Sequence, residues 1–149
     1  MKVLFLDIDG VINRFKCHED GRPDNELDID CIKRLHRIVA ETGCKIVISS
    51  TWKISPHLMD ILEEDLFPYL PAGCIAGCTK THIPQVQRQV EIREYLKEHK
   101  DEIENYVILD DYDFELTTFI NGCHCVITDA LEGLTEEDMY ECIRILNSK

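Results

Sequence analysis

Short apolar runs of β character alternate along this chain with amphipathic helical patterns, and no other feature constrains the fold as strongly. The apolar runs cover residues 2–7, 45–49, 74–76, 106–110 and 124–128. Parallel strands need long crossover connections, which are usually helices, so this alternation is typical of a parallel sheet covered on both faces. We therefore expect an α/β fold built as a three-layer α/β/α sandwich.

Capping residues mark where several helices begin. Asp28, Ser55 and Thr135 each precede an amphipathic pattern, and their side chains can accept the free N–H groups of a first helical turn. Two further helices are predicted over residues 84–99 and, as a short segment, 114–120. The inward-facing residues predicted for the first of these two are Val86, Val90, Tyr95 and Leu96.

The right-handed rule for crossover connections leaves few possible topologies. We expect a Rossmann-like sheet in strand order 3-2-1-4-5, with the first strand at its centre, in a single domain over residues 1–149. Residues 11–27 separate the first strand's acidic end from the first helix, which leaves room for a flap but not for a large cap domain. Four of the five strands end in Asp, Ser or Thr, at the edge where such sheets bind ligands.

Charge and composition narrow the class of partner. The chain has 29 acidic and 16 basic side chains, a formal net charge of -13, so tight binding to nucleic acid is not expected. No apolar stretch approaches the roughly 20 residues of a membrane helix, and the first one ends at Asp7, unlike a signal peptide. We expect no membrane association and a cytoplasmic location.

Eight cysteines are scattered along the sequence. Cys74 with Cys78, and Cys123 with Cys125, have spacings that could in principle contribute to a zinc site. However, Cys123 and Cys125 would lie on the same face of a strand, and Cys44 begins another strand. We therefore expect mainly buried free thiols.

Two acidic clusters follow predicted strands. Asp7-Ile-Asp9-Gly10 comes directly after the most apolar strand, and Gly10 allows a sharp turn there. Asp110 and Asp111 end the fourth strand, which lies beside the first in the predicted order. Taken alone, the first cluster is also compatible with an ordinary turn, and the second with a solvated loop. Carboxylates that converge repel one another unless a cation is present, and oxygen ligands alone favour Mg²⁺.

Weaker candidates lie near other strand ends. Ser49 and Ser50 follow the second strand, where a hydroxyl and free backbone N–H groups can hold phosphate oxygens. Phosphoryl transfer also benefits from a fixed cation beside the nucleophile. Arg88 is the best-placed basic residue for that role, and Lys80 is its competitor. Taken singly, a capping serine or a solvated surface charge explains each of these residues more simply.

Together these motifs resemble the haloacid dehalogenase (HAD) superfamily. Its strand ending in DxD is matched by residues 4–12, its strand ending in Ser or Thr by residues 47–49, and its later acidic motif by Asp110, Asp111 and Glu115. Finer details resemble the HAD domain of "Swiss Army knife" RNA repair proteins. The residues that carry this second resemblance are Asn13, Trp52, the run 109–114 and the segment 133–138.

The resemblance implies catalytic and phosphate-binding roles. Asp7 would attack phosphorus and form an aspartyl-phosphate. Asp9 would protonate the leaving oxygen and then deprotonate the incoming water. Ser49 and the backbone N–H groups near Ser50 and Gly10 would hold phosphate oxygens.

The resemblance also implies a metal site. Mg²⁺ would be bound by Asp7, the carbonyl of Asp9 and Asp111, with Asp110 in support. Arg88 would be the catalytic cation, although the "Swiss Army knife" pattern has glycine after this basic residue and the present chain has Gln89.

The expected function is that of a capless, Mg²⁺-dependent phosphomonoesterase whose substrate is a phosphorylated small molecule, nucleotide or nucleic-acid end. A non-catalytic phosphate-binding or regulatory module with the same fold is the main alternative, but binding alone does not require Asp9. A receiver-like signalling domain is a third possibility. It would need a phosphoacceptor aspartate at the end of its middle strand, and the region between the second and third strands lacks one.

Overall fold

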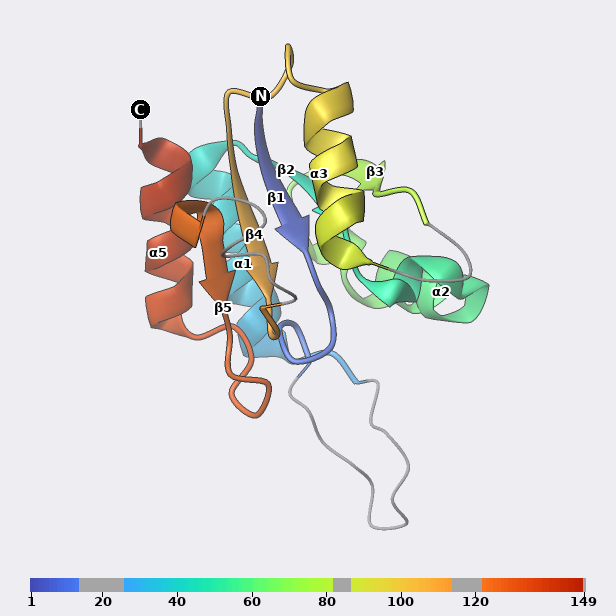
Figure 1. Cartoon of the computed structure of the whole chain (residues 1–149). Helices are drawn as coiled ribbons and strands as arrows, with labels where there is room; N and C mark the ends of the chain where they lie inside the picture. Colours follow the sequence, from blue (N-terminus) through green and yellow to red (C-terminus); the bar gives the residue numbers. More distant parts are fainter. Residues whose placement is uncertain (14–25, 82–86, 114–121, 149) are drawn as a thin grey trace.

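A five-stranded parallel sheet forms the centre of the computed structural model, which describes residues 1–13, 26–81, 87–113 and 122–148 (Figure 1). Its strand order, β3-β2-β1-β4-β5, is the order predicted from the sequence, with β1 central. The strands are β1 (Lys2–Leu6), β2 (Lys45–Ile48), β3 (Ile75–Cys78), β4 (Asn105–Asp110) and β5 (Cys125–Ile127). Their ends differ from the predicted ends by at most two residues.

The register of the three central strands brings their carboxyl ends level. Leu6 of β1 pairs with Ile48 of β2 and with Leu109 of β4. The ladder continues one step further, because the Asp7 N–H donates to the Leu109 carbonyl at 3.0 Å and the Ser49 N–H donates to the Leu6 carbonyl at 3.0 Å. The polar residues that follow these strands therefore share one edge of the sheet.

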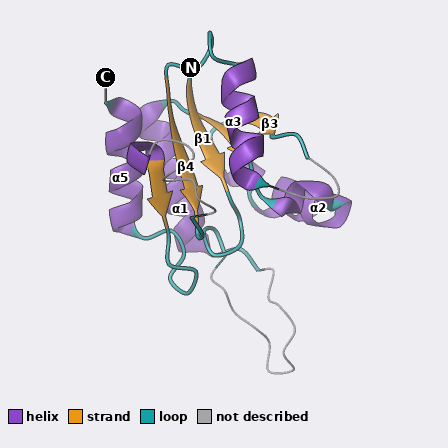
Figure 2. Ribbon diagram, viewed as in Figure 1, coloured by secondary structure: helices purple, strands orange, loops and turns teal. Residues whose placement is uncertain are grey.

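Helices cover both faces of the sheet, which gives the predicted three layers (Figure 2). One face packs against α1 (Ile29–Thr42), α2 (Pro56–Asp65) and α5 (Glu136–Asn147). The other face packs against α3 (Arg88–Glu98), alone among the helices of the described ranges. Successive strand residues point to opposite faces. Accordingly, Leu4 and Leu6 contribute to the first core, and Val3 and Phe5 contribute to the second.

The predicted caps of three helices are confirmed. Asp28 accepts the N–H groups of Asp30 and Cys31 at 2.9 and 3.2 Å, and Ser55 accepts the N–H of Leu58. Thr135 and Asp138 form a reciprocal capping box at the start of α5.

The prediction for α3 was wrong in two respects. The helix begins at Arg88 rather than near Pro84, because Gln87 is extended, with φ -119° and ψ 98°. Its buried residues are Arg88, Glu91 and Ile92, whereas Val90 is only half-buried. The face toward the sheet is thus partly charged, and a hydrophobic stripe is a poor guide to it. Val86, like the predicted short helix over residues 114–120, lies outside the described residues.

The predictions for the cysteines and for the flap agree with the structure only in part. Cys31, Cys44, Cys74 and Cys142 are buried and form no disulfide, as expected, whereas Cys78, which ends an edge strand, and Cys123, which lies in a short 3-10 helix, are exposed. Of the predicted flap, residues 14–25 lie outside the described residues, and Val11 and Ile12 are part of the core. Within the described ranges, no helix has the length and apolar character needed to cross a membrane. Short 3-10 helices complete the fold: η1 (Thr51–Ile54), η2 (Phe67–Tyr69) and η3 (Gly122–His124).

Candidate active site

Three carboxylates from two neighbouring strands converge at the sheet edge. Asp7 follows β1, Asp110 ends β4 and Asp111 comes next in the chain. One ligand oxygen from each lies within 4.8 Å of the others, and they are the one group of potential metal-ligand residues in the part of the chain that the structure describes. Asp7 and Asp110 are buried. An all-oxygen set of this kind fits a hard divalent cation such as Mg²⁺.

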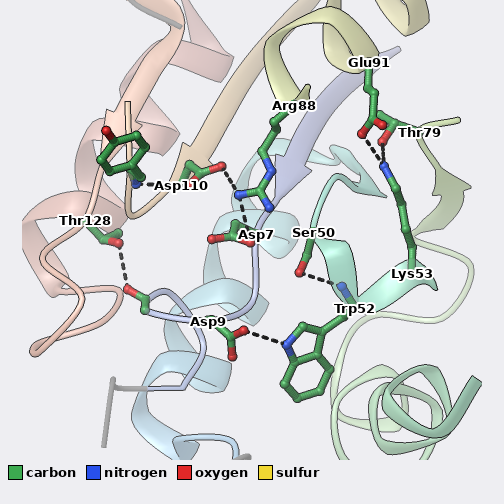
Figure 3. Close-up of polar contacts among 12 residues, drawn as sticks. Asp7, Asp9, Ser50, Trp52, Lys53, Thr79, Arg88, Glu91, Asp110 and Thr128 are labelled. Carbon is green, nitrogen blue, oxygen red and sulfur yellow. Dashed lines mark hydrogen bonds and ion pairs between the residues drawn. The ribbon is translucent and has the colours of Figure 1, made fainter. Parts of the chain in front are cut away.

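Arg88 bridges two of these acids from the first turn of α3 (Figure 3). Its Nη1 lies 2.8 Å from Asp110 Oδ2 and 3.2 Å from Asp7 Oδ1. Arg88 is 7% exposed, so the pairs are shielded from water. Lys80, the alternative cation, lies elsewhere on the surface, where it pairs with Glu98 at 2.7 Å. The geometry therefore places Arg88, and not Lys80, beside the acidic cluster.

The electrostatics of the cluster are unfavourable for a fully ionised state. Burial raises the pKa of the Asp7 carboxyl from 3.8 to about 9, the charge of Asp110 adds to the rise, and Arg88 opposes it. Burial also raises the pKa of Asp110, to about 6, again against the effect of Arg88. One guanidinium is thus insufficient to neutralise three ionised carboxylates in a largely buried site. Such a site gains stability from a second cation.

Asp9 is separated from this group, although it lies only two residues from Asp7. Its Oδ1 accepts a hydrogen bond from Asn13 Nδ2 at 3.0 Å. Its Oδ2 accepts one from the indole Nε1 of Trp52 at 3.0 Å, as Figure 3 shows. The donors are buried, whereas Asp9 itself is exposed. The Asp9 side chain is therefore held in a fixed orientation apart from the metal-ligand group.

Gly10 allows the two acidic segments to approach each other. Its φ is +78°, and a Cβ at this position would lie 2.4 Å from Asp111 Oδ2. The Gly10 carbonyl also accepts the Thr128 hydroxyl at 2.8 Å, which ties the turn to the end of β5. Any side chain at this position would push Asp111 away from Asp7. Gly10 is therefore required for the packing of the cluster.

The two serines after β2 differ in their surroundings. Ser49 is buried, and its hydroxyl has no hydrogen-bond partner among the described residues. A buried hydroxyl in this state is costly unless a ligand completes its bonding. The Ser50 hydroxyl instead caps η1 by accepting the Trp52 N–H at 3.1 Å. Accepting this hydrogen bond leaves the Ser50 O–H able to donate, so the side chain and the backbone N–H of Ser50 both remain candidates for anion contact.

A buried charged network lies behind Arg88. Lys53 Nζ is 2.6 Å from Glu91 Oε1 and 2.6 Å from the Thr79 hydroxyl. The side chains of Lys53 and Glu91 are almost inaccessible to water. Glu91 lies one helical turn after Arg88 on α3, and Lys53 belongs to η1. The network therefore links the turn after β2 to the helix that carries Arg88.

Sequence reasoning missed this network and the contacts of Asp9. Lys53 and Thr79 gave no distinct signal, because single polar residues near strand ends are common. Arg88 and Glu91 are spaced i, i+3 and therefore share a face of the helix with the apolar residues Ile92 and Tyr95. Charges within an apolar stripe were the signal that could have identified α3 as the helix that carries the site.

Comparison with known proteins agrees with this geometry. The model of a family described as the HAD domain in Swiss Army Knife RNA repair proteins matches residues 3–139. No curated protein and no solved structure matches the chain. The match covers most of the 149 residues and includes every candidate site residue named above. The chain therefore belongs to the family of HAD domains in Swiss Army Knife RNA repair proteins, and so to the HAD-type hydrolases.

Proposed function

We propose that this protein is a Mg²⁺-dependent phosphomonoesterase that works through an aspartyl-phosphate on Asp7. The observation that carries the proposal is the convergence of Asp7, Asp110 and Asp111, with ligand oxygens within 4.8 Å of one another, at the carboxyl edge of the sheet. Its membership of the HAD family supports a hydrolase of this general type.

Asp7 is the proposed nucleophile. It lies at the end of the central strand, is 3% exposed, and has one oxygen 3.2 Å from Arg88. An ionised carboxylate in this position can attack phosphorus in line, with release of the leaving alcohol and formation of an acyl phosphate. The Arg88 guanidinium screens the repulsion between the attacking carboxylate and the phosphoryl oxygens.

Asp7 and Asp111 would hold Mg²⁺, together with the main-chain carbonyl of Asp9. The bound ion would neutralise negative charge and orient the phosphate for attack. Asp110 is paired with Arg88 at 2.8 Å, which favours a supporting role for it over direct ligation.

Asp9 is the proposed general acid and base. Its carboxyl lies outside the metal-ligand group and is accessible from solvent, so it can exchange protons. It would donate a proton to the leaving oxygen in the first step and accept one from the attacking water in the second. This feature favours catalysis over the alternative of a non-catalytic phosphate-binding module, which would have no use for such a group.

The phosphoryl oxygens would be held by Ser49 and by backbone N–H groups near Ser50 and Gly10. The Gly10 N–H itself already donates to the carbonyl and side-chain oxygens of Asn13, so the donors at that turn would be its neighbours. The Ser49 hydroxyl supports this proposal, since it is buried without a partner among the described residues and a phosphate oxygen would provide one.

The substrate is proposed to be a phosphate ester of a small molecule, nucleotide or nucleic-acid end. The family name, which refers to RNA repair proteins, supports the last of these. The net charge of -13 predicts weak binding to the remainder of a polynucleotide, so recognition would concentrate on the terminal phosphate. A cytoplasmic location also remains a prediction.

The test is the release of phosphate from an aryl phosphate by wild type and by Asp7→Asn, with and without Mg²⁺. We expect wild type to depend on Mg²⁺ and to lose activity with a chelator, and Asp7→Asn to be inactive while its circular dichroism remains native. Equal rates for the two proteins would refute the proposal. Nucleotide 3′- and 5′-phosphates, phosphorylated RNA ends and phosphopeptides would then identify the substrate class.

A further inference from the structure

The two hydrogen bonds to Asp9 come from residues that have no part in binding the phosphate or the metal. Trp52 reaches Asp9 from η1 after β2, and Asn13 reaches it from the end of the turn that begins at Gly10. Trp52 is 1% exposed and Asn13 is 2% exposed. A free aspartate side chain on a surface turn would sample several rotamers, whereas two donors from separate segments restrict this carboxylate to one.

The orientation of each donor is itself fixed. The Asn13 side-chain oxygen accepts the Gly10 N–H at 3.1 Å, so its amide nitrogen must face Asp9. The backbone N–H of Trp52 donates to the Ser50 hydroxyl, which caps the start of η1. The Trp52 side chain belongs to the same buried apolar core as Leu62 of α2. Both donors are thus held by other contacts and do not depend on Asp9 for their position.

The two hydrogen bonds still leave Asp9 able to carry a proton. An ionised carboxylate offers about four lone-pair sites, two on each oxygen. Asn13 and Trp52 occupy one site on each oxygen. One site on each oxygen remains available for the proton that is given to the leaving group.

We propose that Trp52 and Asn13 are positioning residues that hold the Asp9 carboxyl in the orientation needed for proton transfer to the leaving oxygen. The inference rests on the proposed phosphomonoesterase activity, and it adds two residues that act through Asp9 and do not contact the substrate. Proton transfer requires hydrogen-bond distance and alignment, so a loosely held Asp9 would transfer its proton less often.

The consequence depends on the leaving group. A leaving group of low pKa departs without protonation, whereas an alkoxide needs a proton from the general acid. If Asp9 is no longer held in position, the hydrolysis of alkyl phosphates should therefore slow strongly, and the hydrolysis of esters with good leaving groups should slow little. A variant with a merely structural defect would slow all substrates by the same factor.

The test variant is Trp52→Phe, which keeps an aromatic ring and removes the N–H donor. The values of kcat/KM are measured with Mg²⁺ for para-nitrophenyl phosphate, phenyl phosphate and a simple alkyl phosphate. We expect a loss of about tenfold to a hundredfold for the alkyl ester, and of less than about threefold for para-nitrophenyl phosphate. Leu62→Ala, which removes a buried side chain from the core cluster that includes Trp52 without removing a donor, is the matched control and should leave the ratio between substrates unchanged.

A second comparison places the effect at Asp9. In an Asp9→Asn background, Trp52→Phe should add no further discrimination between leaving groups, because the group that it positions is already gone. Asn13→Ala should give the same pattern as Trp52→Phe and replaces it as the test if Trp52→Phe does not fold.

The possible failures are distinguishable. If wild type hydrolyses none of the phosphate esters, the proposed function itself is wrong. If wild type is active and the two variants slow all three substrates by one common factor, Trp52 and Asn13 are only structural. Additional discrimination by Trp52→Phe in the Asp9→Asn background would equally overturn the positioning role.

Discussion

The two faces of the sheet are built differently. The face under α1, α2 and α5 is a continuous apolar core that includes Leu35, Ile38 and Leu146. The face under α3 has a much smaller apolar cluster, around Phe5 and Ile92, and the charged residues Arg88 and Glu91 of α3 are buried as well. The face under α1, α2 and α5 therefore mainly stabilises the fold, whereas the face under α3 also positions residues of the candidate site.

This contrast shows how a small domain can bury charges near its candidate site. Lys53, Glu91, Arg88, Asp7 and Asp110 are all removed from water, which is costly for each charge alone. The opposite core provides the hydrophobic stabilisation that offsets this cost. We therefore expect mutations on the two faces to separate stability from activity.

The largest effect on stability is expected from breaking the buried ion pair on the α3 face. Glu91→Leu leaves Lys53 as an unpaired buried charge and should lower the free energy of unfolding by about 3–5 kcal/mol. Urea denaturation measures this change. A loss below about 1 kcal/mol, typical of exposed pairs, would show that the pair is solvated and that the contrast between the faces is overstated.

A comparable loss on the opposite face should have a different consequence. Leu35→Ala in α1 opens a cavity in the large core and should cost about 2–5 kcal/mol. The value of kcat/KM per folded molecule should remain that of wild type, because Leu35 belongs to the apolar core on the face of the sheet opposite the helix that carries Arg88. A large fall in kcat/KM at a temperature where the variant is fully folded would contradict the separation.

The pH dependence of stability should reveal the crowded acids. A carboxyl whose pKa is higher in the folded than in the unfolded protein binds its proton more tightly when folded, so stability falls as pH rises between the two values. Without metal, stability should thus decrease from about pH 4 through 6 as Asp110 ionises, and further toward about 9 as Asp7 ionises. Thermal unfolding of chelator-treated protein across this range measures the slope.

Mg²⁺ should reverse that loss. At a Mg²⁺ concentration of about one hundred times Kd, binding adds about 2.7 kcal/mol to the free energy of unfolding at neutral pH. Asp7→Asn should be more stable than wild type without metal and should gain much less from Mg²⁺. Equal Mg²⁺-induced shifts in the melting temperature of the two proteins would place the metal elsewhere.

The smallest stability change and a clear loss of activity are expected from replacing the whole pair. Lys53→Met combined with Glu91→Leu removes both buried charges, and such replacements are often neutral or stabilising. Arg88 lies one helical turn from Glu91, so its register against Asp7 should loosen and kcat should fall. If kcat stayed at the wild-type value, the network would have no role in placing Arg88.

The sheet and its acidic edge were predictable because few physical rules decide them. Apolar runs joined by helices lead to parallel strands, and the crossover rule then puts Asp7 and Asp110 on adjacent strands. The position of Arg88 was less accessible, since it depends on where α3 begins. That start is set by the extended Gln87 and not by a recognisable capping residue.

The contacts of Asp9 and Lys53 could not be predicted from patterns. Trp52 meets Asp9 only because η1 and the turn at Gly10 bend toward each other, which depends on backbone geometry after the strands have ended. Lys53 and Glu91 are charged residues in helical segments, and such residues are usually solvated. Their burial follows from tertiary packing, which no local spacing encodes.

Detection of phosphate covalently bound to Asp7 would test the aspartyl-phosphate mechanism itself. Asp9→Asn is suited to it, because para-nitrophenyl phosphate can phosphorylate Asp7 without a general acid while the water step lacks its base. After acid quenching, peptide mass spectrometry should find an acyl phosphate on the peptide that contains Asp7, and hydroxylamine should remove it. Turnover of this ester by wild type, with no phosphate on Asp7 in Asp9→Asn or with phosphate on another residue, would contradict the account.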